Sequence, residues 1–204
     1  VTVGIGEGDK IGVVGRNGDG KSTLMGALAR KRELDAGRIT WRRDLRVGFL
    51  DQADSLPDGA TVGTVVVGDR PDHEWAGDPR IRDIVEGLLG DVAWDASIGS
   101  LSGGQRRRTA LAALLAGEWD VLFLDEPTNH LDVEGIDWLA RHLNGWAVRD
   151  RALAVVTHDR WFLDAVCTTT WEVHDAIVEA FEGGYAAYVL QCVERDRQAA
   201  VIEG

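Results

Sequence analysis

The chain has 204 residues, 45% of them hydrophobic, and its 34 acidic residues outnumber its 22 basic ones, giving a net charge of −12. That length fits one domain with a subdomain, and the charge excludes a protein whose whole surface binds nucleic acid. Two cysteines without metal-ligand spacing, Cys167 and Cys192, indicate reduced thiols in a cytoplasmic protein. No signal peptide is visible, and no apolar run reaches the ~20 residues of a membrane span. Since the chain begins at Val1, we expect a piece of a longer protein.

Short apolar segments alternate with segments of helical spacing along most of the chain. Strands are predicted at 10–14, 38–41, 45–50, 121–124, 152–156, 169–173 and 177–181. Helices are predicted at 22–29, 79–89, 104–115, 133–143 and 160–165, and a charged helical tail follows from 185. Residues 54–78 are rich in Gly, Pro and Asp and predict a loop, apart from the apolar run 61–67. This alternation is typical of an α/β layered fold.

Residues 15–22, with the sequence GRNGDGKS, fit the phosphate-binding loop pattern in full. They follow a predicted strand and open a predicted helix, which is the context that the motif requires. Glycines let backbone N–H groups turn inward around phosphate oxygens, and the helix N-terminus adds a positive dipole. We expect Lys21 to reach the β and γ phosphates and Ser22 to ligate Mg²⁺. Asp19 is an acid beside an anionic nucleotide, so we expect its side chain to point outward and cap the helix. The predicted nucleotide-binding residues are Gly15, Arg16, Asn17, Gly18, Asp19, Gly20, Lys21, Ser22 and Thr23.

The apolar run 121–124 leads directly into two acids, Asp125 and Glu126. At the C-terminal end of a buried strand, Asp125 is placed to hold Mg²⁺ through water, and Glu126 is placed to polarise an attacking water. The alternative is an ordinary buried strand with two surface acids at its end. The glycine-rich loop in the same chain disfavours that alternative.

A third motif, LSGGQ, precedes a predicted helix and comprises Leu101, Ser102, Gly103, Gly104 and Gln105. Ser102 can cap this helix, and the glycine pair exposes backbone N–H groups to an anion, although the motif alone fits a simple helix cap. Three arginines follow at 106–108. Basic residues at a helix start oppose the helix dipole by ~0.3–1 kcal/mol each, which is easier to understand if this end faces an anionic ligand or partner. A solvated basic face is the alternative.

In this order, the three motifs resemble the ATPase domain of ABC proteins over essentially the whole chain. The resemblance implies an α/β P-loop NTPase domain of the ABC type, with a mixed sheet core and a small helical subdomain. It implies an ATP-binding core at 1–52 and 101–184, a partly helical subdomain at 53–100, and the start of an interdomain linker helix at 185–204. ATP and Mg²⁺ are the implied cofactors.

The resemblance also assigns residues outside the three motifs. Gln52 is implied to contact Mg²⁺ and the attacking water, His158 to be the switch histidine at the γ-phosphate, and Asp132 to belong to an aspartate loop that faces the opposite site. The implied catalytic residues are Glu126, His158 and Gln52, and the implied metal ligands are Ser22, Gln52 and Asp125. The LSGGQ motif acts in trans, on the nucleotide of a partner domain.

A narrower resemblance lies in PTNHLD at 127–132 and THDRWFLD at 157–164, which are similar to the ABC-F subfamily. Members of that subfamily carry two ATPase domains in one soluble chain without transmembrane domains. Many are similar to ribosome-binding translation factors, and some confer antibiotic resistance. The chain resembles a first ABC-F domain, so the implied activity is Mg-dependent ATP hydrolysis, weak in the isolated domain, in a ribosome-associated translation or resistance factor. The implied partners are a second ABC domain, from the parent chain or a second copy, and the ribosome or its rRNA, without membrane insertion.

Two other functions fit the sequence less well. An ATP-binding subunit of a membrane transporter usually has a different aspartate-loop sequence and lacks the arginine-tryptophan-phenylalanine run after the histidine. A chromosome-maintenance ATPase usually places a long coiled coil between the first two motifs, and too few residues separate Ser22 from Leu101 for that. The chain also departs from the ABC pattern, because no aromatic residue precedes the glycine-rich loop to stack on adenine.

Overall fold

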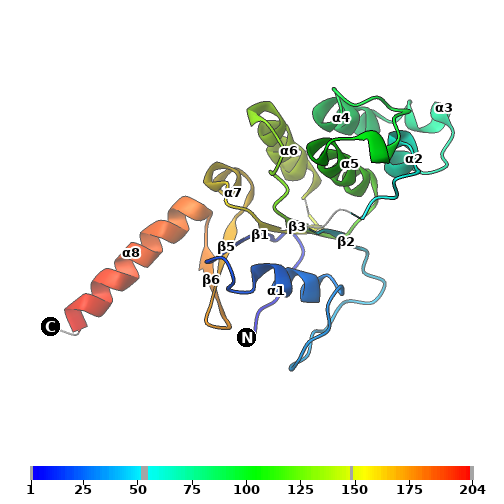
Figure 1. The fold of residues 1–204 in the computed structure, drawn as a ribbon. Coiled ribbons are helices and arrows are strands. Elements are labelled where there is room, and N and C mark those ends of the chain that lie inside the picture. Colours follow the sequence, from blue (N-terminus) through cyan, green and yellow to red (C-terminus); the bar gives the residue numbers. More distant parts are fainter. Residues whose placement is uncertain (1, 52–54, 148, 203–204) are drawn as a thin grey trace.

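The computed structural model describes residues 2–51, 55–147 and 149–202, and within them six strands form one sheet in the order β2-β3-β4-β1-β5-β6 (Figure 1). The strands are β1 (Lys10–Val14), β2 (Val47–Leu50), β3 (Val121–Asp125), β4 (Ala152–Val156), β5 (Thr169–His174) and β6 (Ile177–Glu182). Neighbouring strands are parallel except β5 and β6, which are antiparallel. The prediction of an α/β fold with a mixed sheet is therefore confirmed.

Helices cover both faces of the sheet. Figure 1 shows α1 (Lys21–Leu28) on one face and α5 (Gly103–Ala116), α6 (Val133–Trp146) and α7 (Arg160–Val166) on the other, in agreement with the predicted helices. A hydrophobic core lies on each face of the sheet, and alternate residues of β3 point into one or the other. Phe123 packs in the core that contains Met25 of α1, whereas Leu122 and Leu124 pack in the opposite core. A sheet that is covered on both faces needs continuous apolar strands, which is what the sequence shows at 121–124.

The strands β3, β4 and β1 are adjacent and parallel, so their carboxyl ends meet at one edge of the sheet. There β1 runs into the glycine-rich loop at 15–22, β3 ends just before Glu126, and β4 ends just before Thr157 and His158. Three segments that are far apart in the sequence therefore meet in space. Ligands bind at this edge in open parallel α/β sheets.

A group of helices packs beyond the β2 edge of the sheet (Figure 1). It comprises α5 together with α2 (Val62–Val67), α3 (Asp72–Trp75), α4 (Pro79–Leu88) and the short 3-10 helix η1 (Ile98–Ser100). Helix α4 confirms the prediction at 79–89, and α2 coincides with the apolar run 61–67 that was excepted from the predicted loop. The loop predicted for the rest of 54–78 is wrong at α3. Thr61 caps α2, and Val62, Val66 and Val67 are buried, so burial outweighs the low helix propensity of β-branched residues. The division of the chain at residues 52, 100 and 184 stays a prediction.

The predicted strand at 38–41 is wrong, because these residues, all of which the structure describes, form neither strand nor helix. The Trp41 indole instead donates a hydrogen bond of 3.0 Å to the carbonyl of Leu28 at the end of α1. The Arg30 guanidinium lies 4.7 Å from the centre of the Trp41 ring. The β-like composition of this segment therefore reflects packing against α1. The second predicted strand of this region is confirmed by β2.

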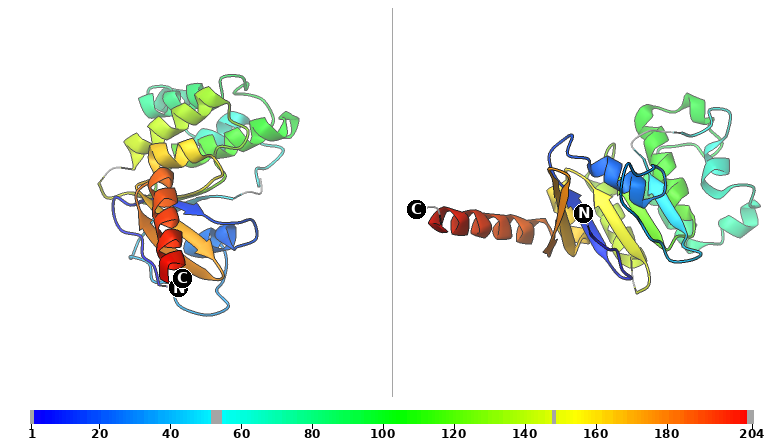
Figure 2. Two further views of the ribbon diagram at one scale, coloured as in Figure 1. Left: turned by 90° about the vertical axis from the view of Figure 1, so that its left-hand side faces the viewer. Right: turned by 90° about the horizontal axis from the view of Figure 1, so that it is seen from below.

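The helical tail is confirmed as α8 (Tyr185–Ile202), which projects away from the sheet (Figure 2). Leu190 and Val193 on this helix are exposed. Among the described residues, no helix is both long enough and apolar enough to cross a membrane.

Candidate active site

The glycine-rich loop wraps around the amino group of Lys21. Its Nζ donates hydrogen bonds to the carbonyls of Gly15 and Arg16, at 2.6 and 3.0 Å. Gly15, Gly18 and Gly20 have φ angles of 155°, 89° and 91°, which other residues rarely adopt. A Cβ on Gly15 would also lie 2.5 Å from the carbonyl oxygen of Val173. The loop conformation therefore depends on glycine at these positions.

Asp19 does not cap helix α1, contrary to the prediction. Its carboxylate folds back over the loop and accepts a 2.7 Å hydrogen bond from the backbone N–H of Arg16. The residue at the N-cap position is Gly20, which offers no side-chain cap. The turn of the loop brings the Arg16 N–H within reach of Asp19, so this carboxylate stabilises the loop rather than the start of the helix.

Glu126 and His158 come together at the ends of β3 and β4, with 3.3 Å between the Glu126 carboxylate and His158 Nε2. Glu126 is buried and has φ of 52°, a left-handed conformation that costs about 1–3 kcal/mol at a non-glycine residue. Burial raises the pKa of the Glu126 carboxyl, while the His158 side chain, the His158 backbone N–H and the Thr157 side chain oppose that rise. A strained, buried carboxylate beside a histidine is a typical arrangement for a general base.

Asp125 is completely buried at the end of β3, one residue before Glu126. Its carbonyl accepts a 2.7 Å hydrogen bond from the guanidinium of Arg107, a buried residue of α5 that also donates to the carbonyl of Asp51. Asp125 ends β3, and Ser22 is the second residue of α1, which follows the glycine-rich loop after β1; both side chains offer oxygen ligands. This donor set fits a hard cation such as Mg²⁺. Gln52, the third predicted ligand, lies outside the described residues.

The LSGGQ segment forms a complete helix cap at the start of α5. Ser102 accepts a hydrogen bond from the backbone of Gln105, and the Gln105 side chain accepts one from the backbone of Ser102. Both Ser102 and Gly103 are exposed, and among described residues nothing lies within 4 Å of a Cβ built on Gly103. This helix N-terminus is therefore open to an incoming partner.

The three arginines after this motif have partners within the chain. Arg106 pairs with Asp58 at 2.6 Å, and Arg108 pairs with Asp91 through Nη2 at 2.8 Å. The Arg108 guanidinium lowers the pKa of Asp91 to about 2. Neither an anionic ligand nor a solvated basic face is needed to explain them, because they fasten α5 to neighbouring segments. Asp132 likewise caps a helix, since it accepts a 2.8 Å hydrogen bond from the backbone of Gly135 at the start of α6.

A cavity of about 720 Å³ opens beside the glycine-rich loop. Lys21, Asp19 and His158 line it together with the end of β5 and Tyr185 of α8. Within the described part of the chain, residues 101–105 contribute nothing to this lining. The structure therefore brings the loop and the histidine together on one cavity and leaves the LSGGQ segment elsewhere.

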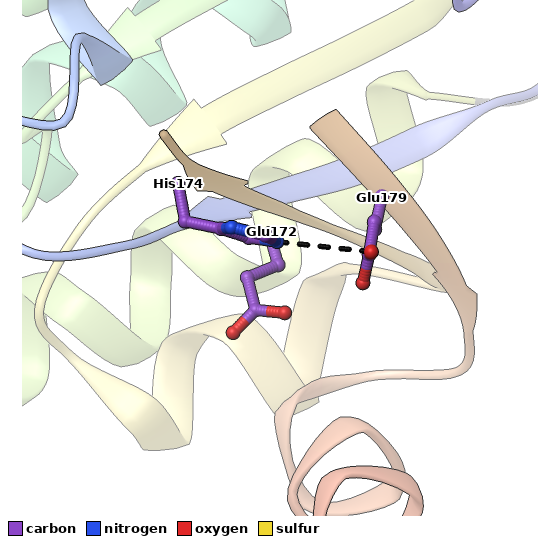
Figure 3. Close-up of side chains that lie close together, drawn as sticks. All are labelled: Glu172, His174 and Glu179. Atoms are coloured by element: carbon purple, nitrogen blue, oxygen red, sulfur yellow. Dashed lines mark ion pairs between the residues drawn. The ribbon is translucent and has the colours of Figure 1, made fainter. Parts of the chain in front are cut away.

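Figure 3 shows Glu172 and His174 on β5 beside Glu179 on β6. Their ligand atoms lie within 4.8 Å of one another, as metal ligands do. Arg195 of α8, however, lies 3.3 Å from the Glu172 carboxylate and 3.0 Å from that of Glu179, and Tyr188 donates a 2.7 Å hydrogen bond to Glu172. The cluster therefore fastens α8 to the β5–β6 hairpin.

Two buried threonines that no sequence motif indicates, Thr128 and Thr157, lie in the segments after β3 and β4. The hydroxyls of Thr128 and Thr157 are 2.9 Å apart, and both residues are buried. They flank the predicted site residues in the PTNHLD and THDRWFLD segments. Arg107 was also missed as a site residue. No spacing rule reveals these contacts, because they join segments that only the sheet brings together.

Comparisons with known proteins identify relatives of this chain. The family described as ABC transporter matches residues 1–129. The chain is 34% identical to the tylosin resistance ATP-binding protein TlrC of Streptomyces fradiae, over 97% of this chain and 43% of TlrC. It is 34% identical to the energy-dependent translational throttle protein EttA of Escherichia coli strain K12, over 95% of this chain and 41% of EttA. A chain in the crystal structure of the archaeal ribosomal stalk protein aP1 with the ribosome recycling factor aABCE1 superimposes with a TM-score of 0.78, at 27% identity, over 93% of this chain and 37% of that chain.

Proposed function

Because the chain belongs to the ABC transporter family of ATP-binding domains, we propose that it binds Mg-ATP at the edge formed by β1, β3 and β4 and hydrolyses it there. The observation that carries this proposal is the 3.3 Å approach of Glu126 to His158, which lines the same cavity as the loop that holds Lys21. Phosphoryl transfer needs a positioned water and compensation of negative charge, and these groups are suited to both.

Each side chain has a role in this mechanism. Lys21 and the N–H groups of the glycine-rich loop bind the β and γ phosphates. Glu126 accepts a proton from the attacking water, and His158 contacts the γ-phosphate while it orients Glu126. Ser22 and Asp125, with the predicted ligand Gln52, would hold Mg²⁺, which would supply positive charge to the phosphates. The strained backbone of Glu126 fixes the direction of its carboxylate before the nucleotide arrives.

The complete site also needs a partner domain. Ser102 and Gly103 are exposed at the N-terminus of α5 and do not line the cavity of their own domain. An exposed helix N-terminus suits the γ-phosphate of a nucleotide bound to another copy or another domain. ATP then lies between two domains, and hydrolysis releases them.

The wider role that we propose is that of an ABC-F type factor acting on ribosomes. Support comes from EttA, whose name describes a translational throttle, and from TlrC, named for tylosin resistance. The chain spans about two fifths of the length of these relatives, so a second ATPase domain in the parent protein is part of the proposal. The alternative is the ATP-binding subunit of a membrane transporter, a class in which the fold also occurs.

Two measurements on the 204-residue chain test the proposed function. Mg-ATP is expected to support phosphate release, and a chelator is expected to abolish it while nucleotide binding is only weakened. Glu126→Gln in Mg-ATP is expected to cosediment with purified ribosomes more than it does in ADP. Failure to bind a fluorescent ATP analogue would contradict the ATPase proposal. Equal sedimentation in ATP and ADP, together with a membrane protein that copurifies with the chain, would favour the transporter alternative.

Asp19 gives a separate prediction about affinity. Asp19→Asn keeps the acceptor for the Arg16 N–H and removes one negative charge near the triphosphate. A gain of about 1 kcal/mol, or roughly fivefold in ATP affinity, is expected at low salt, and it should shrink as KCl is added. Asp9→Asn is the matched control, because Asp9 accepts an equivalent 2.7 Å hydrogen bond from Gly6 just before β1, at the other end of that strand from the glycine-rich loop. Unchanged affinity in Asp19→Asn would show that this carboxylate does not face the phosphates.

A further inference from the structure

A tryptophan of α6 joins this helix to α4, in the group of helices beyond β2. Trp138 is buried, and its indole lies so close to Gly87 of α4 that a Cβ built on Gly87 would be 2.5 Å from Nε1. The same Nε1 donates a 3.3 Å hydrogen bond to the carboxylate of Asp83. The ring of His142 stacks on the indole with 4.9 Å between the ring centres, and His142 Nδ1 lies 3.7 Å from the Asp83 carboxylate. We refer to these four residues as the α4–α6 contact.

The spacing of the four residues explains why they meet. Asp83 and Gly87 are four residues apart on α4, and Trp138 and His142 are four residues apart on α6, so each pair lies on one face of its helix. The two faces pack against each other. Any side chain at position 87 would take space that the indole occupies, so glycine is required for this close approach.

Helices α4 and α5 are fastened to each other near both ends. Arg108 of α5 donates a 2.8 Å hydrogen bond to the carbonyl of Leu88 at the end of α4 and pairs with Asp91. Arg80 near the start of α4 donates hydrogen bonds of 3.1 and 3.2 Å to the carbonyls of residues 115–117 at the end of α5. Two helices that are joined in this way move together. The LSGGQ segment at the start of α5 therefore follows any movement of α4.

Helix α6, in contrast, is fixed to the sheet. Its residues Leu139 and Leu143 are buried in the core that contains Leu122 of β3, and the helix begins directly after the PTNHLD segment. It lies beside α4 (Figure 1). A cavity of about 580 Å³ borders the α4–α6 contact and is lined by Trp138 and Gly87 together with residues 130–132. Packing between the two parts is therefore open next to this contact.

We propose that Trp138 is a positioning residue, which sets the angle of α4 and α5 on the sheet and thereby the place where LSGGQ meets a partner's nucleotide. The inference rests on the proposed action of LSGGQ on a partner domain. Arg107 attaches α5 to the backbone at Asp125, and a single attachment leaves a helix free to turn about it. The α4–α6 contact is a second attachment, so the orientation becomes fixed. Among the described residues, Trp138 and Gly87 are not part of the lining of the cavity beside the glycine-rich loop.

The main test introduces Gly87→Ala into the Glu126→Gln chain. The added methyl group pushes the indole of Trp138 away and turns α4 against α6. We expect the dissociation constant of the dimer in Mg-ATP, measured by light scattering, to rise by roughly 5- to 150-fold, the range that overpacking of a close contact produces. ATP affinity of the single chain, measured with a fluorescent nucleotide, should change by no more than about twofold. A general loss of structure would lower both.

Gly145→Ala is the matched control. Gly145 is also in a helix, α6, and among the described residues nothing lies within 4 Å of a Cβ built on it. The same chemical change there should leave the dimer unaffected. Asp83→Ala is a second variant that adds no bulk: Asp83 is exposed, so the fold should be retained, and loss of the acceptor for Trp138 should weaken the dimer less than Gly87→Ala does. Thermal melting of each variant checks the fold.

A double variant tests whether Gly87 acts through Trp138. Trp138→Leu removes the indole and should itself weaken the dimer. With Gly87→Ala added, no further weakening is expected, because the methyl group then has no indole to displace. Additive losses would contradict the proposal, since they would show that the two positions act independently.

The remaining outcomes separate the inference from the proposed function. If Glu126→Gln alone does not form a dimer in Mg-ATP, the proposed partner arrangement fails and the role of Trp138 fails with it. If this dimer forms and Gly87→Ala leaves its dissociation constant unchanged, the role of Trp138 alone is refuted. An equal loss of ATP affinity and dimer affinity in Gly87→Ala would also refute it, because the contact would then support the whole fold rather than the position of LSGGQ.

Discussion

Glu126→Gln is expected to reduce ATP turnover by ~10²–10⁴-fold while ATP affinity stays nearly unchanged. Glutamine keeps the size of the side chain and loses the basic oxygen that accepts the proton of water. Glu126 lies 3.3 Å from His158 and is buried, so few other groups can replace it as a base. Phosphate release measures turnover, and titration with a fluorescent nucleotide measures affinity. The control is Glu134→Gln, an exposed acid in the first turn of α6. Unchanged turnover in Glu126→Gln would refute its assignment as the base.

Lys21→Ala should give the opposite pattern, in which the main loss is in ATP affinity. The ammonium group is the positive charge held inside the glycine-rich loop, and charge-assisted hydrogen bonds contribute about 1.5–3 kcal/mol, which corresponds to roughly 10- to 150-fold in affinity. Lys10→Ala is the matched control, because Lys10 lies at the other end of β1 and contacts Asn144. Normal ATP affinity in Lys21→Ala would contradict its role at the phosphates.

Another large effect is expected on the association of two copies of the chain. With ADP the chain is expected to be monomeric. Glu126→Gln with Mg-ATP is expected to shift toward a dimer, because unhydrolysed ATP then persists between the two copies. Each copy carries Lys21 and Ser102 on different surfaces, so two copies can complete each other's sites in an isologous pair with two-fold symmetry. Light scattering with ATP, with ADP and without nucleotide measures the shift.

Ser102→Arg, added to Glu126→Gln, is expected to abolish this shift. The larger side chain would clash at the γ-phosphate of the partner, and a clash of ~1–3 kcal/mol lowers dimer affinity by roughly 5- to 150-fold. Because Ser102 also caps α5, Ser102→Ala serves as the control that removes the cap without adding bulk. A dimer that forms equally well without nucleotide would contradict ATP as the bridging ligand. A chain that stays monomeric at high concentration would indicate that its natural partner is a different domain.

Sequence periodicity predicted the elements whose own residues decide their structure. The strands at 10–14 and 152–156 have the predicted bounds, because these are apolar runs buried on both faces of the sheet. The segments at 38–41 and 61–67 show the limit of this reasoning. The first was predicted as a strand, yet Trp41 packs against the end of α1. The second was described only as an apolar run, and its residue Val62 lies in a helix buried against α5. In each case contacts with distant parts of the chain outweigh local propensity.

The candidate site also contains residues that the sequence predicted and residues that only the structure reveals. Motif order pointed to Glu126 and His158, and the adjacency of β3 and β4 places them side by side. The arginines at 106–108 could not be interpreted from sequence, because their acidic partners Asp58 and Asp91 are far away in the chain. Thr128 and Thr157 were invisible for a similar reason. The sequence around a hydroxyl does not show which way it points. The hydroxyls of Thr128 and Thr157 meet only because the segments after β3 and β4 lie side by side.

Arg107 has a mechanical consequence for a dimer of such domains. Its guanidinium holds α5 to the backbone at the ends of β2 and β3, through the carbonyls of Asp51 and Asp125. Rotation of α5 against the sheet would break hydrogen bonds of a buried charge, at about 1.5–3 kcal/mol each. In the proposed dimer, we expect a force that a partner's nucleotide exerts on the N-terminus of α5 to reach Asp125 in the domain's own proposed site. We expect this connection to couple the two proposed ATP sites.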